Sequence, residues 1–151
     1  NSPGQFVVSG SNNAIEAVEE RARDAGALKA VALDVSGPWH SRYMEPAREP
    51  LREALNTVNW SDGKPAVANV TADFVEASPT SHLIDQLVEP VRWIESIQLL
   101  IDHRVERFIE VGPADVLAGL VKRIASQSDR DVDIRTTDTI EETDKLLEEM
   151  N

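Results

Sequence analysis

Short apolar runs alternate along this chain with longer segments whose apolar residues recur every three or four positions. The runs lie at residues 5–9, 29–34, 66–70, 107–111 and 132–135. Their length is typical of buried strands, whereas the spacing in the intervening segments predicts amphipathic helices. Strands separated in this way by helices predict an α/β protein with a mainly parallel sheet.

The predicted order of elements indicates where a site would lie. In a parallel sheet, the crevice that holds an active site lies at the carboxyl ends of the strands. His40 follows the run at residues 29–34, Asn69 ends the next run, and the Gly112-Pro113 turn ends the fourth. We therefore expect these three places to converge on one edge of the sheet.

The composition argues against several classes of protein. No apolar run in the 151 residues approaches the roughly 20 that a membrane helix needs. The formal net charge of −12 argues against nucleic-acid binding, which needs a basic surface. Without cysteine there is no disulfide or thiolate nucleophile, and no His/Asp/Glu cluster has convincing metal-ligand spacing. We expect a cytoplasmic protein with no metal and no cofactor.

His40 is the candidate catalytic base. An imidazole can take up and return a proton near neutral pH, although a histidine at a strand end can also simply bond to the backbone. The chain offers His40 no evident nucleophile. Ser9 and Ser36 are the serines flanked most nearly by glycine, and neither forms the Gly-x-Ser-x-Gly turn of a nucleophile elbow.

Six motifs, in their order and spacing, resemble those of the malonyl-CoA:acyl carrier protein transacylases. They are residues 1–5 with 7–10, residues 35–46 around His40, and residues 68–71, 86–93, 108–113 and 119–124. The resemblance covers nearly the whole chain and implies the C-terminal portion of such an enzyme. Residues 1–35 would form the C-terminal half of a ferredoxin-like small subdomain. Residues 36–151 would form the C-terminal part of an α/β-hydrolase-like large subdomain.

The resemblance implies an acyltransferase that works through a serine–histidine pair. Such an enzyme moves malonyl from coenzyme A to its serine, and then to the phosphopantetheine thiol of acyl carrier protein. The serine in its Gly-His-Ser-x-Gly elbow would lie in an N-terminal half that this chain lacks. We therefore expect the chain alone to be inactive and to need that half as a partner. The alternatives are a non-catalytic fragment or degenerate relative that acts as a scaffold, and the excised acyltransferase domain of a polyketide synthase.

Two residues match the family's proton-transfer machinery. His40 matches the base, and Gln86 matches the position whose main-chain carbonyl orients the imidazole. If the carbonyl is the active group, the side chain of Gln86 matters less than the geometry of the helix end. The alternative for Gln86 is an ordinary amide on a helix surface.

Four further residues match positions near the substrates. Trp39 and Asn69 match residues at the acyl pocket, and the bulk of Trp39 predicts a preference for malonyl over methylmalonyl. Core packing of Trp39 and turn formation by Asn69 are the alternatives. Lys122 and Arg123 would help to receive acyl carrier protein or coenzyme A phosphates. In the last turn of a helix they would also complement the helix dipole.

Overall fold

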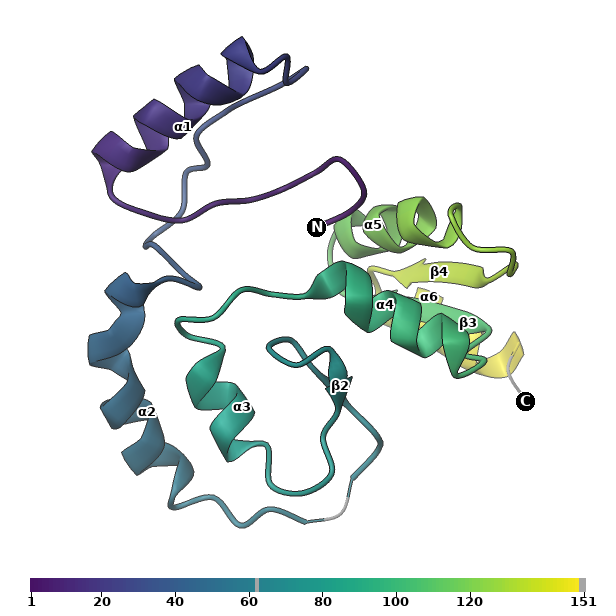
Figure 1. The fold of residues 1–151 in the computed structure, drawn as a ribbon. Helices are drawn as coiled ribbons and strands as arrows, with labels where there is room; N and C mark the ends of the chain where they lie inside the picture. Colours follow the sequence, from purple (N-terminus) through teal and green to yellow (C-terminus); the bar gives the residue numbers. More distant parts are fainter. Residues whose placement is uncertain (62, 150–151) are drawn as a thin grey trace. The chain divides into compact units, whose positions relative to one another are not determined.

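The computed structural model describes residues 1–61 and 63–149, which form two compact units. One unit is Val7–Arg92, and the other combines Asn1–Phe6 with the chain from Trp93 onward. Figure 1 shows the elements of both units. None of the described helices has both the length and the apolar composition that crossing a membrane requires.

The unit that contains Trp93 is built on a parallel pair of strands. β3 (Arg107–Val111) pairs with β4 (Asp133–Thr137), and Phe108 lies opposite Ile134. A parallel pair needs a crossover connection, which a helix provides here. This strand–helix–strand unit is the arrangement that the sequence predicts. The helices of the unit are α4 (Trp93–Asp102), α5 (Val116–Ala125) and α6 (Ile140–Glu149).

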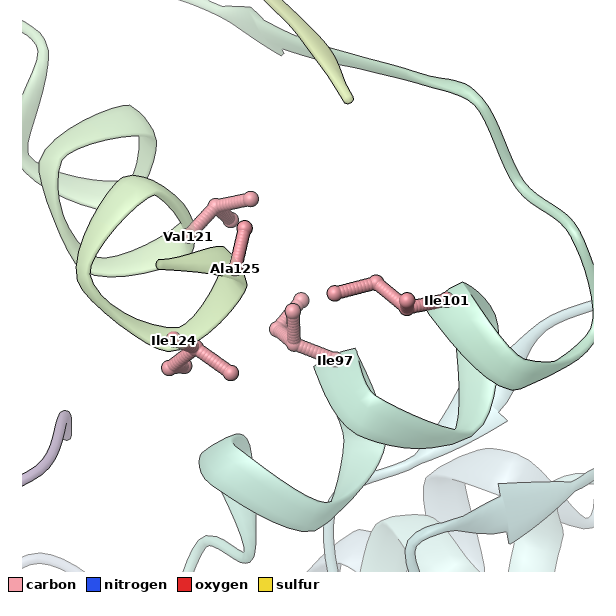
Figure 2. Close-up of a cluster of buried hydrophobic side chains, with 5 residues drawn as sticks. All are labelled: Ile97, Ile101, Val121, Ile124 and Ala125. Atoms are coloured by element: carbon pink, nitrogen blue, oxygen red, sulfur yellow. The ribbon is translucent and has the colours of Figure 1, made fainter. Parts of the chain in front are cut away.

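The core of this unit lies between α4 and α5, whose apolar faces meet (Figure 2). Its buried side chains are Ile97 and Ile101 from α4 and Val121, Ile124 and Ala125 from α5. Their spacing of three or four residues places them on one face of each helix. Val116 and Leu117, which the pattern also predicts to be buried, are exposed. They belong to the first turn of α5, which no described residue covers sufficiently to bury them.

Carboxylates stabilise the starts of two helices. The two oxygens of Glu110 accept the backbone N–H groups of Leu117, at 3.1 Å, and Ala118, at 2.7 Å, in the first turn of α5. Those N–H groups have no partner within the helix, and negative charge is favourable at this end. α6 starts with a capping box. The N–H of Glu142 donates to Thr139 Oγ1, and the N–H of Thr139 donates to the Glu142 carboxylate.

Asp133 connects the two strands of the parallel sheet at their starts. Its carboxylate accepts Arg135 Nε at 2.7 Å and Arg107 Nε at 2.8 Å. These hydrogen bonds from Arg135 and Arg107 favour the ionised carboxylate, so they lower the pKa of Asp133. The contact from Arg107 crosses the sheet, and the ionised form of Asp133 therefore stabilises the pairing of β3 with β4.

Helices are the main regular structure of the unit Val7–Arg92. Its elements are α1 (Asn12–Asp24), the 3₁₀ helix η1 (Arg42–Ala47), α2 (Arg48–Leu55), β1 (Val67–Ala68), β2 (Asp73–Phe74) and α3 (Thr80–Asp85). Gly26 ends α1 in the left-handed region, with φ 87°, a conformation that glycine adopts without a steric penalty. The predicted strand at 66–70 is shorter, and β1 pairs antiparallel with β2 rather than within a parallel sheet. α2 and α3 lie side by side (Figure 1).

The predicted strands at 5–9 and 29–34 do not form. Among the described residues neither run pairs in a sheet, apart from an isolated bridge between Gln5 and Ser2. Their apolar side chains are exposed, with Phe6 at 78% and Leu33 at 56%. A strand needs a neighbour to bond its N–H and C=O groups, and an apolar composition cannot replace that neighbour.

Candidate active site

His40 lies in a tight turn between the run at 29–34 and η1, and its side chain is exposed. Its backbone has φ 59°, the left-handed region, which costs a residue with a Cβ atom about 1–3 kcal/mol. Ser41 stabilises this turn from both sides. Its Oγ donates to the Pro38 carbonyl at 2.6 Å and accepts the N–H of Tyr43 at 3.4 Å at the start of η1. The local hydrogen bonds therefore hold the strained conformation that aims the imidazole.

The imidazole of His40 meets the backbone at the end of α3. Nδ1 lies 2.6 Å from the main-chain oxygen of Gln86, which caps the helix. Carbonyls in the last turn of a helix have no partner N–H within it, so this oxygen is available to an outside donor. Because a carbonyl oxygen only accepts, the contact places the proton on Nδ1. Nε2 is then the unprotonated nitrogen of the neutral ring, the atom that a base uses.

The side chain of Gln86 is engaged by Asn69. Asn69 Nδ2 donates to Gln86 Oε1 at 3.3 Å. Asn69 is itself positioned after β1, because its main-chain oxygen accepts the N–H of Arg92 at 2.9 Å. His40 and Asn69, which we expected to converge, thus both contact Gln86, one through the carbonyl and the other through the amide. Convergence with the Gly112-Pro113 turn, which belongs to the other unit, stays a prediction.

Trp39 and the two basic residues occupy different surroundings. The ring of Trp39 is 45% exposed and lies against Gly37, so it is not a core residue of this unit. Lys122 and Arg123 lie in the last turn of α5, in the other unit. Arg123 donates to the side chain of Gln5 at 3.2 Å. A cation at this end of the helix also opposes its partial negative charge.

The ion pair between Arg48 and Asp85 was not predicted from the sequence. Arg48 Nη2 lies 2.5 Å from Asp85 Oδ1, which joins the first residue of α2 to the last residue of α3. The two residues are 37 positions apart, so no local spacing marks them as partners. Ser41 belongs to the motif at residues 35–46, but the sequence predicted no role for its hydroxyl group, although serine is a common residue at a helix start. Within residues 1–61 and 63–149, no group of three or more His, Asp or Glu side chains is arranged to hold a metal ion.

Comparison with known proteins identifies relatives over the full chain. It is 42% identical over 154 residues to the malonyl CoA-acyl carrier protein transacylase of Bacillus subtilis, covering 100% of this chain and 48% of the relative. It is 39% identical over 145 residues to the Staphylococcus aureus enzyme, covering 94% of this chain and 46% of the relative. This chain is a homologue of the malonyl-CoA:acyl carrier protein transacylases. It spans about half the length of these relatives. No protein-family model matches it.

Solved transacylase structures share the fold. The enzyme from Xanthomonas oryzae superimposes with a TM-score of 0.82 at 33% identity, over 93% of this chain and 44% of that one. The Streptococcus pneumoniae enzyme has a TM-score of 0.80 at 34% identity, over 93% of this chain and 45% of that one. A malonyl-transacylase in complex with a type II polyketide synthase acyl-carrier protein has a TM-score of 0.84 at 29% identity, over 93% of this chain and 45% of that one. The predicted α/β fold class is therefore confirmed as part of the transacylase fold.

Proposed function

We propose that this chain supplies the base of a malonyl-CoA:acyl carrier protein transacylase, and that an N-terminal half of the same enzyme supplies the serine nucleophile. The contact between His40 Nδ1 and the Gln86 carbonyl supports this proposal most directly. It fixes the proton on one ring nitrogen and leaves Nε2 to face a hydroxyl group. Because the homologues of this chain are transacylases, we infer that the base so placed acts in malonyl transfer.

The proposed reaction transfers malonyl in two steps. His40 Nε2 takes the proton of the serine hydroxyl as its oxygen attacks the malonyl thioester, and then gives the proton to the departing coenzyme A sulfur. In the second step the imidazole takes the proton of the phosphopantetheine thiol while its sulfur attacks the malonyl ester. The proton then returns to the serine oxygen. No cofactor takes part in either step.

The Gln86 carbonyl has two roles in this proposal. It holds the ring in the tautomer with the proton on Nδ1, and it accepts a hydrogen bond from the imidazolium that forms in each step. This is the role of the orienting acceptor in serine–histidine enzymes, filled here by a backbone oxygen. Because a backbone carbonyl is present in every residue type, the side chain at position 86 is expected to contribute little.

The remaining residues are assigned to the substrates. Trp39, exposed one residue before the base, is proposed to narrow the acyl pocket, and Asn69 to border it. Lys122 and Arg123 are proposed to receive the acidic carrier protein or the phosphates of coenzyme A. The reaction would serve fatty acid synthesis in the cytoplasm.

The two subdomains are assigned as the resemblance implies. We place residues 1–35 in the small subdomain and residues 36–151 in the large one. The exposed apolar runs at 5–9 and 29–34 would then pair with strands of the N-terminal half. The chain alone is expected to be inactive because its base has no hydroxyl group to activate.

The test is formation of the malonyl-serine intermediate. The native polypeptide that contains this chain is incubated with malonyl-CoA, and its intact mass is measured before and after the reaction. We expect a polypeptide about twice as long that gains one malonyl group, and a large loss of that gain in His40→Ala. A native polypeptide of this length that takes up no malonyl, or an unaffected His40→Ala, would favour the scaffold interpretation instead.

A further inference from the structure

Two contacts connect the segment that carries His40 with the end of α3. The first is the hydrogen bond between His40 and the Gln86 carbonyl. The second is the ion pair between Arg48 and Asp85, at 2.5 Å. Asp85 is the residue immediately before Gln86, so both contacts hold the same helix end.

The turn that holds His40 leads directly into a nearly continuous helical stretch that contains Arg48. Ser41 is the N-cap residue of η1, and η1 runs directly into α2 at Arg48 because Ala47, its last residue, has helical backbone angles. Arg48 Nη1 also lies 3.5 Å from the carboxylate of Glu45 in η1. The guanidinium of Arg48 thus contacts a carboxylate of its own helical stretch and, at the same time, Asp85 on α3. Asp85 and Gln86 are adjacent, so a displacement of Asp85 would also displace the carbonyl that His40 contacts.

We propose that Arg48 is a positioning residue for the reaction: its ion pair with Asp85 holds the end of α3 where the Gln86 carbonyl meets His40 Nδ1. This inference rests on the proposed role of His40 as the base. The hydrogen bond of 2.6 Å is short, and a displacement of about 1 Å takes it beyond the usual range. Without the ion pair the imidazole is free to populate the other tautomer, in which Nε2 is protonated and cannot act as a base.

The ion pair is suited to positioning rather than to stabilising the fold. The side chains of Arg48 and Asp85 are 28% and 46% exposed. Water screens such a pair, and its contribution to global stability is small. A variant that lacks it is therefore expected to remain folded, so that a change in transfer rate reports the geometry of the base.

The chain provides a matched control one helical turn away. Arg52 lies on α2 like Arg48, but its ion pair, at 3.2 Å, is with Glu49 on the same helix. Arg52→Ala thus removes an arginine and an ion pair from α2 without touching the contact with α3. Arg48→Lys retains the charge and is the conservative variant.

The experiment compares Arg48→Ala, Arg48→Lys, Asp85→Asn, the double variant Arg48→Ala/Asp85→Asn, Arg52→Ala and His40→Ala in the complete enzyme. Malonyl transfer to carrier protein gives kcat and KM. ¹⁵N NMR at a pH where the ring is neutral gives the tautomer of His40, whose signals are those lost in His40→Ala. We expect Arg48→Ala to lower kcat about 10-fold with little change in KM, and to reduce the Nδ1–H tautomer. Asp85→Asn should lower kcat and reduce the Nδ1–H tautomer to the same extent, and the double variant should lose no more than either single variant. Arg48→Lys should retain most of the wild-type kcat, and Arg52→Ala should retain all of it.

Two different results would separate this inference from the function on which it rests. If Arg48→Ala keeps the wild-type rate and tautomer while His40→Ala is inactive, Arg48 has no positioning role but the base assignment stands. If His40→Ala itself transfers malonyl at the wild-type rate, the proposed function fails. The inference would also be overturned if Arg48→Ala lowered the rate without changing the tautomer of His40, or if Arg52→Ala lowered the rate as much as Arg48→Ala does.

Discussion

The clearest prediction concerns Gln86, because the structure assigns its backbone and its side chain to different partners. Gln86→Ala leaves the carbonyl that accepts from His40 and removes only the contact of Oε1 with Asn69, at 3.3 Å. A neutral hydrogen bond contributes about 0.5–1.5 kcal/mol net. If the whole of this hydrogen-bond free energy were lost in the transition state, the transfer rate would fall by about tenfold at most. Loss of a general base in His40→Ala costs about 10²- to 10⁴-fold.

The assay is malonyl transfer from malonyl-CoA to carrier protein by the complete enzyme, with kcat and KM measured for both variants. Asn69→Ala is the companion variant, because it removes the donor side of the same contact. If that contact is all the Gln86 side chain contributes, Asn69→Ala and Gln86→Ala have equal kcat, and any additional rise in KM for Asn69→Ala reports contact with the substrate. A loss in Gln86→Ala as large as that in His40→Ala would refute the role of the carbonyl.

Three further predictions concern the helix start, the strand pair and the acyl pocket. Glu110→Gln weakens the charge-assisted bonds to the first turn of α5, and we expect denaturant unfolding to show a loss of about 1–2 kcal/mol. An unchanged midpoint would contradict the capping role. The pKa of Asp133 is lowered in the folded state, so its stabilisation is complete above the ordinary aspartate value of about 3.9. It is lost as the pH falls through the folded pKa. Asp133→Asn should therefore be less stable than the wild type at neutral pH, and the difference should vanish in acid unfolding scans. Trp39→Ser should raise methylmalonyl transfer relative to malonyl transfer, and an unchanged ratio of the two kcat/KM values would exclude Trp39 from the pocket.

Local chemistry made much of the fold predictable. The apolar spacing of α4 and α5, the glycine that ends α1 and the capping box of α6 all act over a few residues, and each is where the pattern indicates. The run at 107–111 is also a strand as predicted, because β4 supplies its partner. The runs at 5–9 and 29–34 have a similar pattern without such a partner. Strand formation depends on a neighbour as much as on composition.

The sequence by itself determined the residue types and the family resemblance: a histidine after Trp39, a glutamine at the end of a short helix, and no serine elbow. Only the tertiary structure decided which atoms meet. The bond of His40 to the Gln86 carbonyl spans 46 residues, and the ion pair of Arg48 with Asp85 spans 37. A backbone carbonyl has no signature in the residue type that carries it. Its role depends on where the packing of α2 against α3 leaves the end of the helix, which is a property of the folded chain.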